Sequence, residues 1–296
     1  MACTTILVGK AASYDGSTMI ARNDDSGSGH FTAKKFTVIH PEDLPKTYRS
    51  VLSHVEIPLP EGALRFTAMP NAVEGKGIWR LPVSTPPMWH DRHRDHHLQP
   101  PRAGRRPAGG VSAPRVKSRG ARRHWRGGYR LSGAALYPLC REGVLRLGSL
   151  LEQYGTYEMN GIAFQDVNEI WWLETIGGHH WIARRVPDDV YVVMPNQLGI
   201  DTFDLEDAFG AQENYLCSAD LREFIAKNHL DLSLDGALNP RDAFGSHDDA
   251  DHVYNTPRAW YMLRYLNPRT WVWEGADADY TPMSDDLRGA WCRSAR

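Results

Sequence analysis

The first 25 residues constrain the fold most strongly, because they place two apolar runs on either side of a turn. The first run, 4–8 (TTILV), is rich in β-branched residues and predicts a short buried strand. Residues 14–17 (YDGS) are typical of a turn, with glycine for a positive φ, and 18–21 (TMIA) predict the returning strand. The resulting hairpin would bring Cys3 beside the polar cluster 22–25 (RNDD).

Two roles are open for Cys3 from its position alone. As the first residue of a mature chain, its thiol could use its own α-amine as a base, because pKa values of ~8 and ~8.5 let a proton pass between them near neutral pH. This role requires removal of Met1 and Ala2. The alternative is a buried structural cysteine at the start of a strand, since free cysteine is among the most buried residue types.

Length and composition exclude several classes of protein. A chain of 296 residues with 42% hydrophobic content can bury one large core or two modest ones. No apolar run approaches the ~20 residues of a membrane span, and the first residues lack the pattern of a signal peptide. The four cysteines have neither metal nor redox spacing. We therefore expect a cytoplasmic protein with no membrane partner, no cofactor and no metal.

The segment 80–139 differs in charge from the rest of the chain. It holds 13 of the 34 Lys and Arg but only 2 of the 36 Asp and Glu, so the remaining residues carry 21 basic and 34 acidic side chains. Between residues 80 and 130 the segment has no sustained period of a strand or helix, which predicts disorder. A basic disordered segment could contact nucleic acid, but a second hypothesis explains its composition better.

We interpret 80–139 as translated out of frame. GC-rich DNA read in the wrong frame tends to encode Arg, Pro, Ala, Gly and His. Codons for residues 90–111, read one base later, permit MTATETITSNPRVLGADPLVE, which is ordinary globular sequence. Residues 288–296 also lose the pattern of the preceding chain. We interpret them as a second frameshift with a truncation.

From residue 141 onward the apolar periodicity returns. Helical spacing predicts helices over 142–154, 205–209, 218–228 (with Ser218 as the N-cap) and 257–265. Four strand-like runs are separated by turn residues, at 161–164, 169–175, 180–185 and 190–194. These runs predict an antiparallel meander that forms one sheet. Trp171 and Trp172 would then lie on opposite faces of that sheet.

The segment 247–252 (HDDADH) contains residue types that bind metals. We interpret it as a structural or substrate-facing polar loop rather than a metal site.

Taken together, these segments resemble the C69 dipeptidases, which are N-terminal-nucleophile hydrolases related to penicillin V acylases and bile-salt hydrolases. The resemblance rests on 3–5 (CTT), 15–17 (DGS), 21–25 (ARNDD), 53–57, 68–72, 77–79, 141–143 and the region from the 160s to about 287. It implies an α+β fold, the four-layer αββα sandwich of these hydrolases. It also implies a single domain over 1–296, interrupted at 80–139 and truncated at the C-terminus.

The resemblance further implies a cysteine-type dipeptidase, a hydrolase that cleaves dipeptide amide bonds. Cys3 would be the nucleophile, Arg22 would lower its thiol pKa, and Asp25 would hold its α-amine. The expected partners are dipeptide substrates, with no nucleic acid, and the expected assembly is a homo-oligomer.

Two later residues resemble active-site groups of the related acylases. Asn196 follows the run 190–194 and would donate to the oxyanion, and Arg258 lies near a helix start. A turn asparagine and an exposed helix arginine remain equally open for them at this point. A further asparagine of the family, in a Gly-Val-Asn-Glu stretch, falls inside 80–139 and is absent. Two alternatives therefore stay open: an acyl hydrolase of the penicillin-acylase type, and an inactive frameshifted remnant.

Overall fold

The computed structural model describes residues 3–23, 33–34, 36–49, 55–59, 65–68, 140–156, 159–231, 233, 237–246, 251–275, 278 and 291–293. The segment 80–139, which the sequence predicts to be disordered, lies outside these residues, and so does Asp25. None of the described helices is long and apolar enough to cross a membrane.

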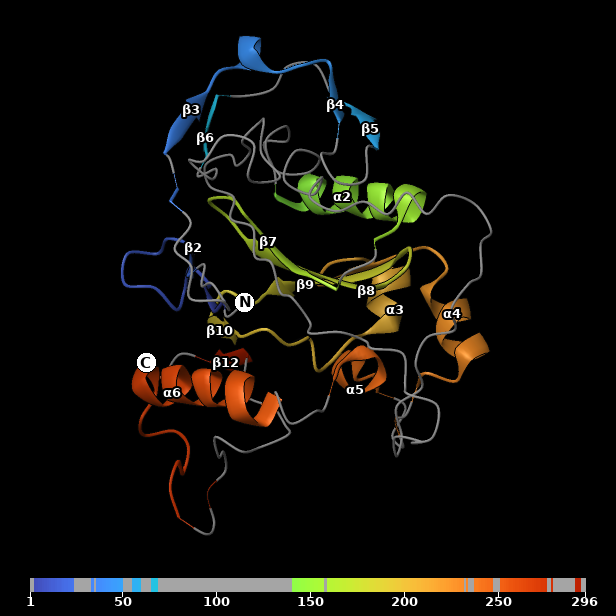
Figure 1. Ribbon diagram of the computed structural model, residues 1–296. Coiled ribbons are helices and arrows are strands. Elements are labelled where there is room, and N and C mark those ends of the chain that lie inside the picture. The colour runs from blue at the N-terminus through green and yellow to red at the C-terminus, as the bar shows by residue number, and fades with distance from the viewer. Residues whose placement is uncertain are drawn as a thin grey trace.

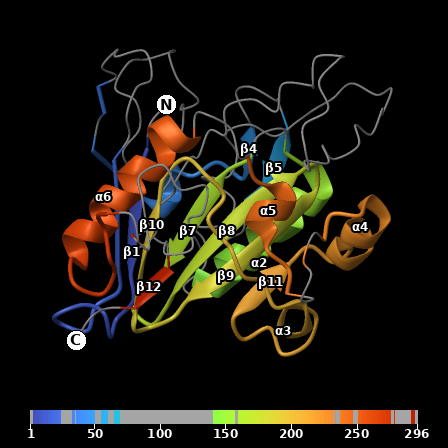
Figure 2. The same cartoon turned by 90° about the horizontal axis from the view of Figure 1, so that it is seen from below.

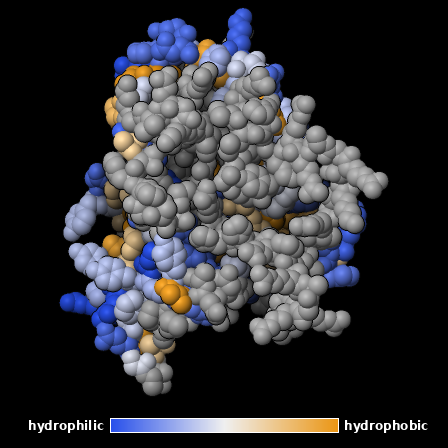
Figure 3. All heavy atoms as spheres, in the orientation of Figure 1, coloured by the Kyte–Doolittle hydropathy of each residue, from blue (hydrophilic) through white to orange (hydrophobic). Residues whose placement is uncertain are grey.

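The N-terminal half contains β1 (Thr5–Val8), β2 (Met19–Arg22), β3 (Thr37–Ile39), η1 (Pro41–Asp43), β4 (Thr47–Arg49), β5 (Glu56–Pro58) and β6 (Phe66–Ala68). The remaining elements are α2 (Cys140–Tyr154), β7 (Gly161–Gln165), β8 (Ile170–Gly177), β9 (His180–Val186), β10 (Val190–Met194), α3 (Leu205–Phe209), β11 (Tyr215–Cys217), α4 (Leu221–Asn228), α5 (Pro240–Phe244), η2 (Asp251–Asn255), α6 (Thr256–Leu266) and β12 (Trp291–Arg293). Hydrophilic residues predominate over η1 at the top of the molecule (Figure 3).

The predicted N-terminal hairpin is confirmed. β1 and β2 pair antiparallel, with Thr5 opposite Arg22, and Gly16 takes the positive φ of +75° that the turn requires. On its other edge β1 pairs antiparallel with β10, so that Thr5 also lies opposite Met194. One four-stranded sheet thus has the order β12-β10-β1-β2.

The prediction that the four runs after residue 160 form one sheet is wrong for the last of them. β7, β8 and β9 form a meander with β11 at its edge, whereas β10 belongs to the sheet of β1. The turn at 187–189 crosses between the sheets and bonds to the end of β1: Gly9 donates to Val190 and Ala11 donates to Asp188. All five residues of β10 are buried, because both faces of this strand are covered. Its continuous apolar run therefore fits the sheet of β1 as well as it would fit the meander.

The two larger sheets pack face to face around the main hydrophobic core. Leu7 and Val192 from one sheet meet Trp172 and Ile182 from the other. Trp171 points to the opposite face, into the cluster beneath α2, so the prediction that the two tryptophans face opposite ways is confirmed. Figure 1 shows α2 above the β7–β9 sheet, on the side away from β10.

Helix α6 covers the outer face of the sheet that contains β1. Ala259 and Leu263 pack against Tyr191 and Val193 of β10. Seen from below, α6 lies across β1, β10 and β12 (Figure 2). The hydrophobic face of α6 therefore holds the first turn of this helix against the sheet edge at which β1 begins.

The predicted helix ends are confirmed at one position and corrected at another. α2 ends before Gly155, whose φ is +69° as expected of a C-terminal glycine. Ser218 is not the side-chain N-cap of α4, because Asp220 occupies that position. The backbone N–H of Ser218 instead bonds to Trp181, which extends the β11 pairing by one residue.

The contact of α2 with its sheet leads to a prediction at Gly148. A Cβ at this position would overlap the buried indole ring of Trp181. We expect Gly148→Ala to lower the free energy of unfolding by about 1–3 kcal/mol, although alanine favours helices by ~1 kcal/mol over glycine. Urea unfolding of the variant beside Ser149→Ala, at the exposed neighbouring position, measures this; equal stability of the two variants would contradict it.

Candidate active site

Three chain segments meet at one edge of the sheet that contains β1. Because Thr5 lies opposite both Arg22 and Met194, the residues just before β1, at the end of β2 and just after β10 come together. This edge brings together Cys3, Arg22 and Asn196, which are up to 193 positions apart in sequence. The first turn of α6 adds Arg258.

Cys3 is buried, with 1% of its surface exposed, and each of its polar atoms contacts one of these residues. Its backbone N–H donates to Oδ1 of Asn196 at 2.9 Å. Its carbonyl oxygen accepts from Nη1 of Arg258 at 2.7 Å. Nη2 of Arg22 lies 3.2 Å from Sγ in hydrogen-bonding geometry. The cation of Arg22 therefore favours the thiolate form of the cysteine.

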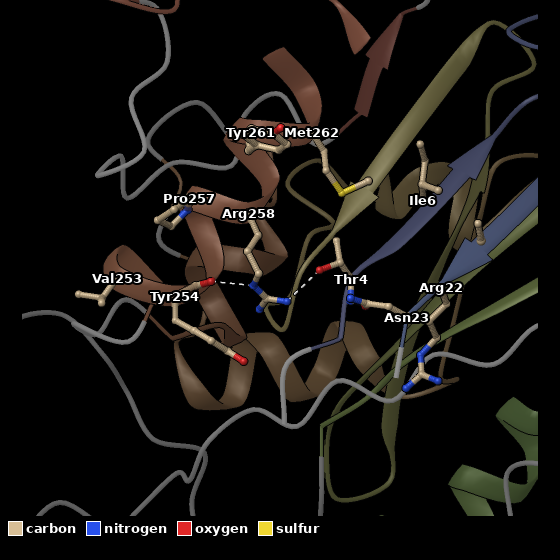
Figure 4. Close-up of a pocket in the computed structure, with 11 residues that line it drawn as sticks. Thr4, Ile6, Arg22, Asn23, Val253, Tyr254, Pro257, Arg258, Tyr261 and Met262 are labelled. Carbon is tan, nitrogen blue, oxygen red and sulfur yellow. Dashed lines mark hydrogen bonds between the residues drawn. The ribbon is translucent and has the colours of Figure 1, made fainter. Parts of the chain in front are cut away.

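The guanidinium group of Arg258 connects α6 to the residues just before β1 and just after β10. Nη1 also donates to Oγ1 of Thr4 at 2.9 Å, and Nη2 donates to Oδ1 of Asn196 at 2.9 Å and to Oδ1 of Asn255 at 2.6 Å. Nε donates to the carbonyl oxygen of Tyr254 at 2.7 Å. Figure 4 shows Arg258 extending from α6 toward Thr4, the residue just before β1. The planar fork of arginine suits such a junction, because its donors have fixed directions.

Asn196 has one satisfied and one unsatisfied side-chain atom. Its Oδ1 accepts from both Cys3 and Arg258, whereas its buried Nδ2 has no hydrogen-bond partner among the described residues. A buried donor without a partner costs roughly 1–3 kcal/mol. The arrangement therefore holds a donor beside the cysteine that a bound molecule could satisfy.

Glu174 holds the loop that carries Asn196. This carboxylate on β8 accepts from the backbone of Gly199 at 2.7 Å, from Ile200 at 3.4 Å and from Nε1 of Trp172 at 2.9 Å. Its side chain is fully buried, and burial raises its pKa to about 7, although the three hydrogen bonds act in the opposite direction. The Asp201 carboxylate adds to the rise in pKa.

A mainly apolar pocket of about 720 Å³ lies beside these residues, between β1, β2 and α6. Its walls include Ile6, Tyr254, Tyr261 and Met262, as Figure 4 shows. Side chains alternate along a strand, so Ile6 faces this pocket while Cys3 lies on the same side as the buried Thr5. Arg22 and Arg258, which contact Cys3, also line the pocket, so the pocket adjoins the cysteine site.

One group of metal-binding residue types among the described residues is engaged in a hydrogen bond and an ion pair. Cys140, Asp166 and Glu169 lie together, but Asp166 accepts from the backbone of Cys140 and Glu169 pairs with Arg185 at 3.0 Å. Burial strongly raises the pKa of the Cys140 thiol. In the segment 247–252 the structure describes only the last two residues.

The structure brings together four of the five residues that the sequence indicates: Cys3, Arg22, Asn196 and Arg258. Sequence reasoning missed Asn255 and Glu174 as groups around the site. The sequence did contain a sign of the role of Glu174, since it is the one carboxylate inside the apolar run 170–176. It contained none for Asn255, because its role depends on contacts made between distant segments.

Several known proteins are similar to most of this chain. The sequence model of peptidase family C69 matches residues 2–82 and 137–287. A dipeptidase of Bifidobacterium longum is 52% identical over 318 aligned positions, which cover 99% of this chain and 55% of that protein. A probable dipeptidase A of Streptococcus pyogenes is 49% identical (90% of this chain, 55% of that protein), and dipeptidase A of Lactobacillus helveticus is 42% identical (90% and 54%). The chain spans about half the length of the curated relatives it matches.

The buried carboxyl group of Glu174 leads to a prediction about pH. Its pKa is higher in the folded protein than its ordinary value of 4.5, so the folded state binds the extra proton between pH 4.5 and about 7. Its contribution to stability is therefore full below pH 4.5 and is lost as pH rises to about 7, by an amount on the order of 3 kcal/mol.

We expect Glu174→Gln to flatten this part of the pH dependence. Urea unfolding of wild type and variant at pH 4.5 and 7.5 measures the difference. Glu152→Gln is the control, because Glu152 also accepts from a tryptophan Nε1 but is exposed. Parallel pH dependence in wild type and Glu174→Gln would show that Glu174 does not titrate in this range.

Proposed function

The chain belongs to peptidase family C69, and on that premise we propose that it hydrolyses the peptide bond of dipeptides with Cys3 as the nucleophile. The observation that carries the proposal is the convergence of Arg22, Asn196 and Arg258 on this one buried cysteine. The relatives named dipeptidase support the choice of substrate class.

In the proposed reaction, Sγ of Cys3 attacks the carbonyl carbon of the dipeptide. The carbon–nitrogen bond then breaks, the second amino acid leaves with a proton on its amine, and the first remains as a thioester on Cys3. Water hydrolyses the thioester, which releases the first amino acid and returns the thiol. Arg22 supports the thiolate before the attack.

The proton that Sγ loses requires a base, and we assign this role to the α-amine of Cys3 after removal of Met1 and Ala2. The contact between the nitrogen of Cys3 and Oδ1 of Asn196 supports this assignment, because it would orient the free amine. We assign Asp25 to the same amine on the strength of the family resemblance.

We assign Nδ2 of Asn196 to the negative oxygen that forms during the attack. The amide is buried and unpartnered among the described groups, so an oxyanion would relieve an existing cost. Arg258 holds the opposite end of the same amide at 2.9 Å and so keeps Nδ2 directed away from itself.

We also propose that the fold is the four-layer αββα sandwich of N-terminal-nucleophile hydrolases, in one domain. Support comes from the packing of two sheets on each other, with α2 and α6 over their outer faces.

An inactive remnant is a second candidate, and one observation favours it. The family match omits residues 83–136, an interval inside the segment 80–139 that we interpret as frameshifted. Resequencing the gene across 79–141 and beyond 287 tests the frameshift. Dipeptide hydrolysis by this chain, compared with a version in the restored frame, tests the activity: turnover only in the restored version would identify this chain as the remnant.

The nucleophile assignment predicts that Cys3→Ala abolishes dipeptide hydrolysis, lowering kcat at least about 1,000-fold. Cys217→Ala is the matched control, since burial raises the pKa of the Cys217 thiol to about 12 and makes it a poor nucleophile. We expect the control to retain kcat within about twofold, as measured by amino acid release. Equal activity of the two variants would exclude Cys3 as the nucleophile.

The oxyanion assignment predicts a different kinetic effect for Asn196→Ala. We expect kcat to fall about 100- to 1,000-fold with little change in KM, because the donor acts chiefly in the transition state. Steady-state kinetics measures both values. A change confined to KM would indicate ground-state substrate binding instead.

A further inference from the structure

Asp251 and Asn255 lie beside the site, and the proposed reaction gives them no role. They are the first and last residues of the π-helical turn η2, which leads directly into α6. Their exposed fractions are 4% and 5%. Single π-helical turns are rare and occur frequently at functional sites. Two buried polar side chains on such a turn therefore require an explanation.

The side-chain amide of Asn255 joins the two elements that deliver Asn196 and Arg258. Its Nδ2 donates to the backbone oxygen of Asn196 at 3.2 Å, and its Oδ1 accepts from Nη2 of Arg258 at 2.6 Å. One amide thus ties the loop after β10 to the first turn of α6.

Asp251 determines which way this amide points. Its Oδ1 accepts from Nδ2 of Asn255 at 2.6 Å, and its Oδ2 accepts from Oγ of Ser246 at 2.8 Å. A reversed Asn255 amide would place its carbonyl oxygen against the Asp251 carboxylate and its N–H groups against the Arg258 guanidinium. Both contacts are repulsive, so Asp251 selects the observed orientation.

We propose that Asp251, acting through Asn255, is a positioning residue for Asn196 and Arg258 in the reaction at Cys3. This inference rests on the proposed dipeptide hydrolysis. The effect of Asp251 reaches the nucleophile through Asn255 and Arg258, whose Nη1 donates to the Cys3 carbonyl oxygen.

Asp251→Ala removes the group that orients the amide. We expect kcat to fall about 10- to 100-fold while KM stays within about threefold, because the substrate still binds but the site is misaligned. Asp251→Asn retains an acceptor oxygen for Nδ2 of Asn255, and we expect it to recover most of the lost kcat. Steady-state kinetics on a dipeptide, with urea unfolding to establish that each variant is folded, measures these effects.

Asp242→Ala is the matched control. On α5, Oδ2 of the exposed Asp242 accepts from Nδ2 of Asn239 at 2.7 Å, which gives an Asp–Asn pair with the same donor and acceptor types at the surface. We expect its kcat to equal that of wild type. Equal kcat in the Asp251→Ala and Asp242→Ala variants would overturn the inference, and so would equal impairment of Asp251→Asn and Asp251→Ala.

Wild type and Cys3→Ala separate this inference from the proposed function. If wild type shows no hydrolysis that depends on Cys3, the proposed function fails, and crystal structures of wild type and Asp251→Ala decide the positioning role. Displacement of Nη2 of Arg258 from Oδ1 of Asn196 in the variant supports the inference. An unchanged contact overturns it.

Discussion

The pairing of β1 with a strand on each side is the constraint on which the rest of the site depends. The registers with β2 and β10 both pass through Thr5, and together they decide which residues reach the edge of the sheet. A shift by one residue would turn the Cys3 side chain to the opposite face. The same shift would move Arg22 away from the sulfur. The register therefore determines the contacts of the cysteine as well as the pairing of the strands.

Several polar groups around the site lie in the interior and make hydrogen bonds. The guanidinium of Arg258 has acceptors on η2, on Thr4 just before β1 and on the loop after β10, and the carboxyl group of Glu174 has three donors. Buried polar groups that are fully bonded specify one arrangement, whereas an unbonded group is costly. Nδ2 of Asn196 is one of the buried groups without a partner among the described residues, and an oxyanion beside Cys3 would supply that partner.

The apolar layers supply the rigidity that such a network needs. The core between the sheets holds β1 and β10 from one side, and α6 holds β10 from the other. Packing between α6 and β10 therefore holds the first turn of α6, and the core between the sheets holds the strand that leads into the loop after β10. The hydrogen bonds of Asn255 connect these two segments through Asn196 and Arg258, both of which contact the cysteine.

Local patterns in the sequence determined the N-terminal hairpin, the helix over 142–154 and the four runs after residue 160, because alternation and turn residues act over a few positions. Family-specific motifs indicated Cys3, Arg22, Asn196 and Arg258. Only the tertiary structure decided that β10 leaves its neighbours to pair with β1, since both arrangements satisfy the same local pattern. Only the tertiary structure likewise assigned the partners of Asn255 and Glu174, because a side chain's hydrogen bonds depend on segments brought together by folding.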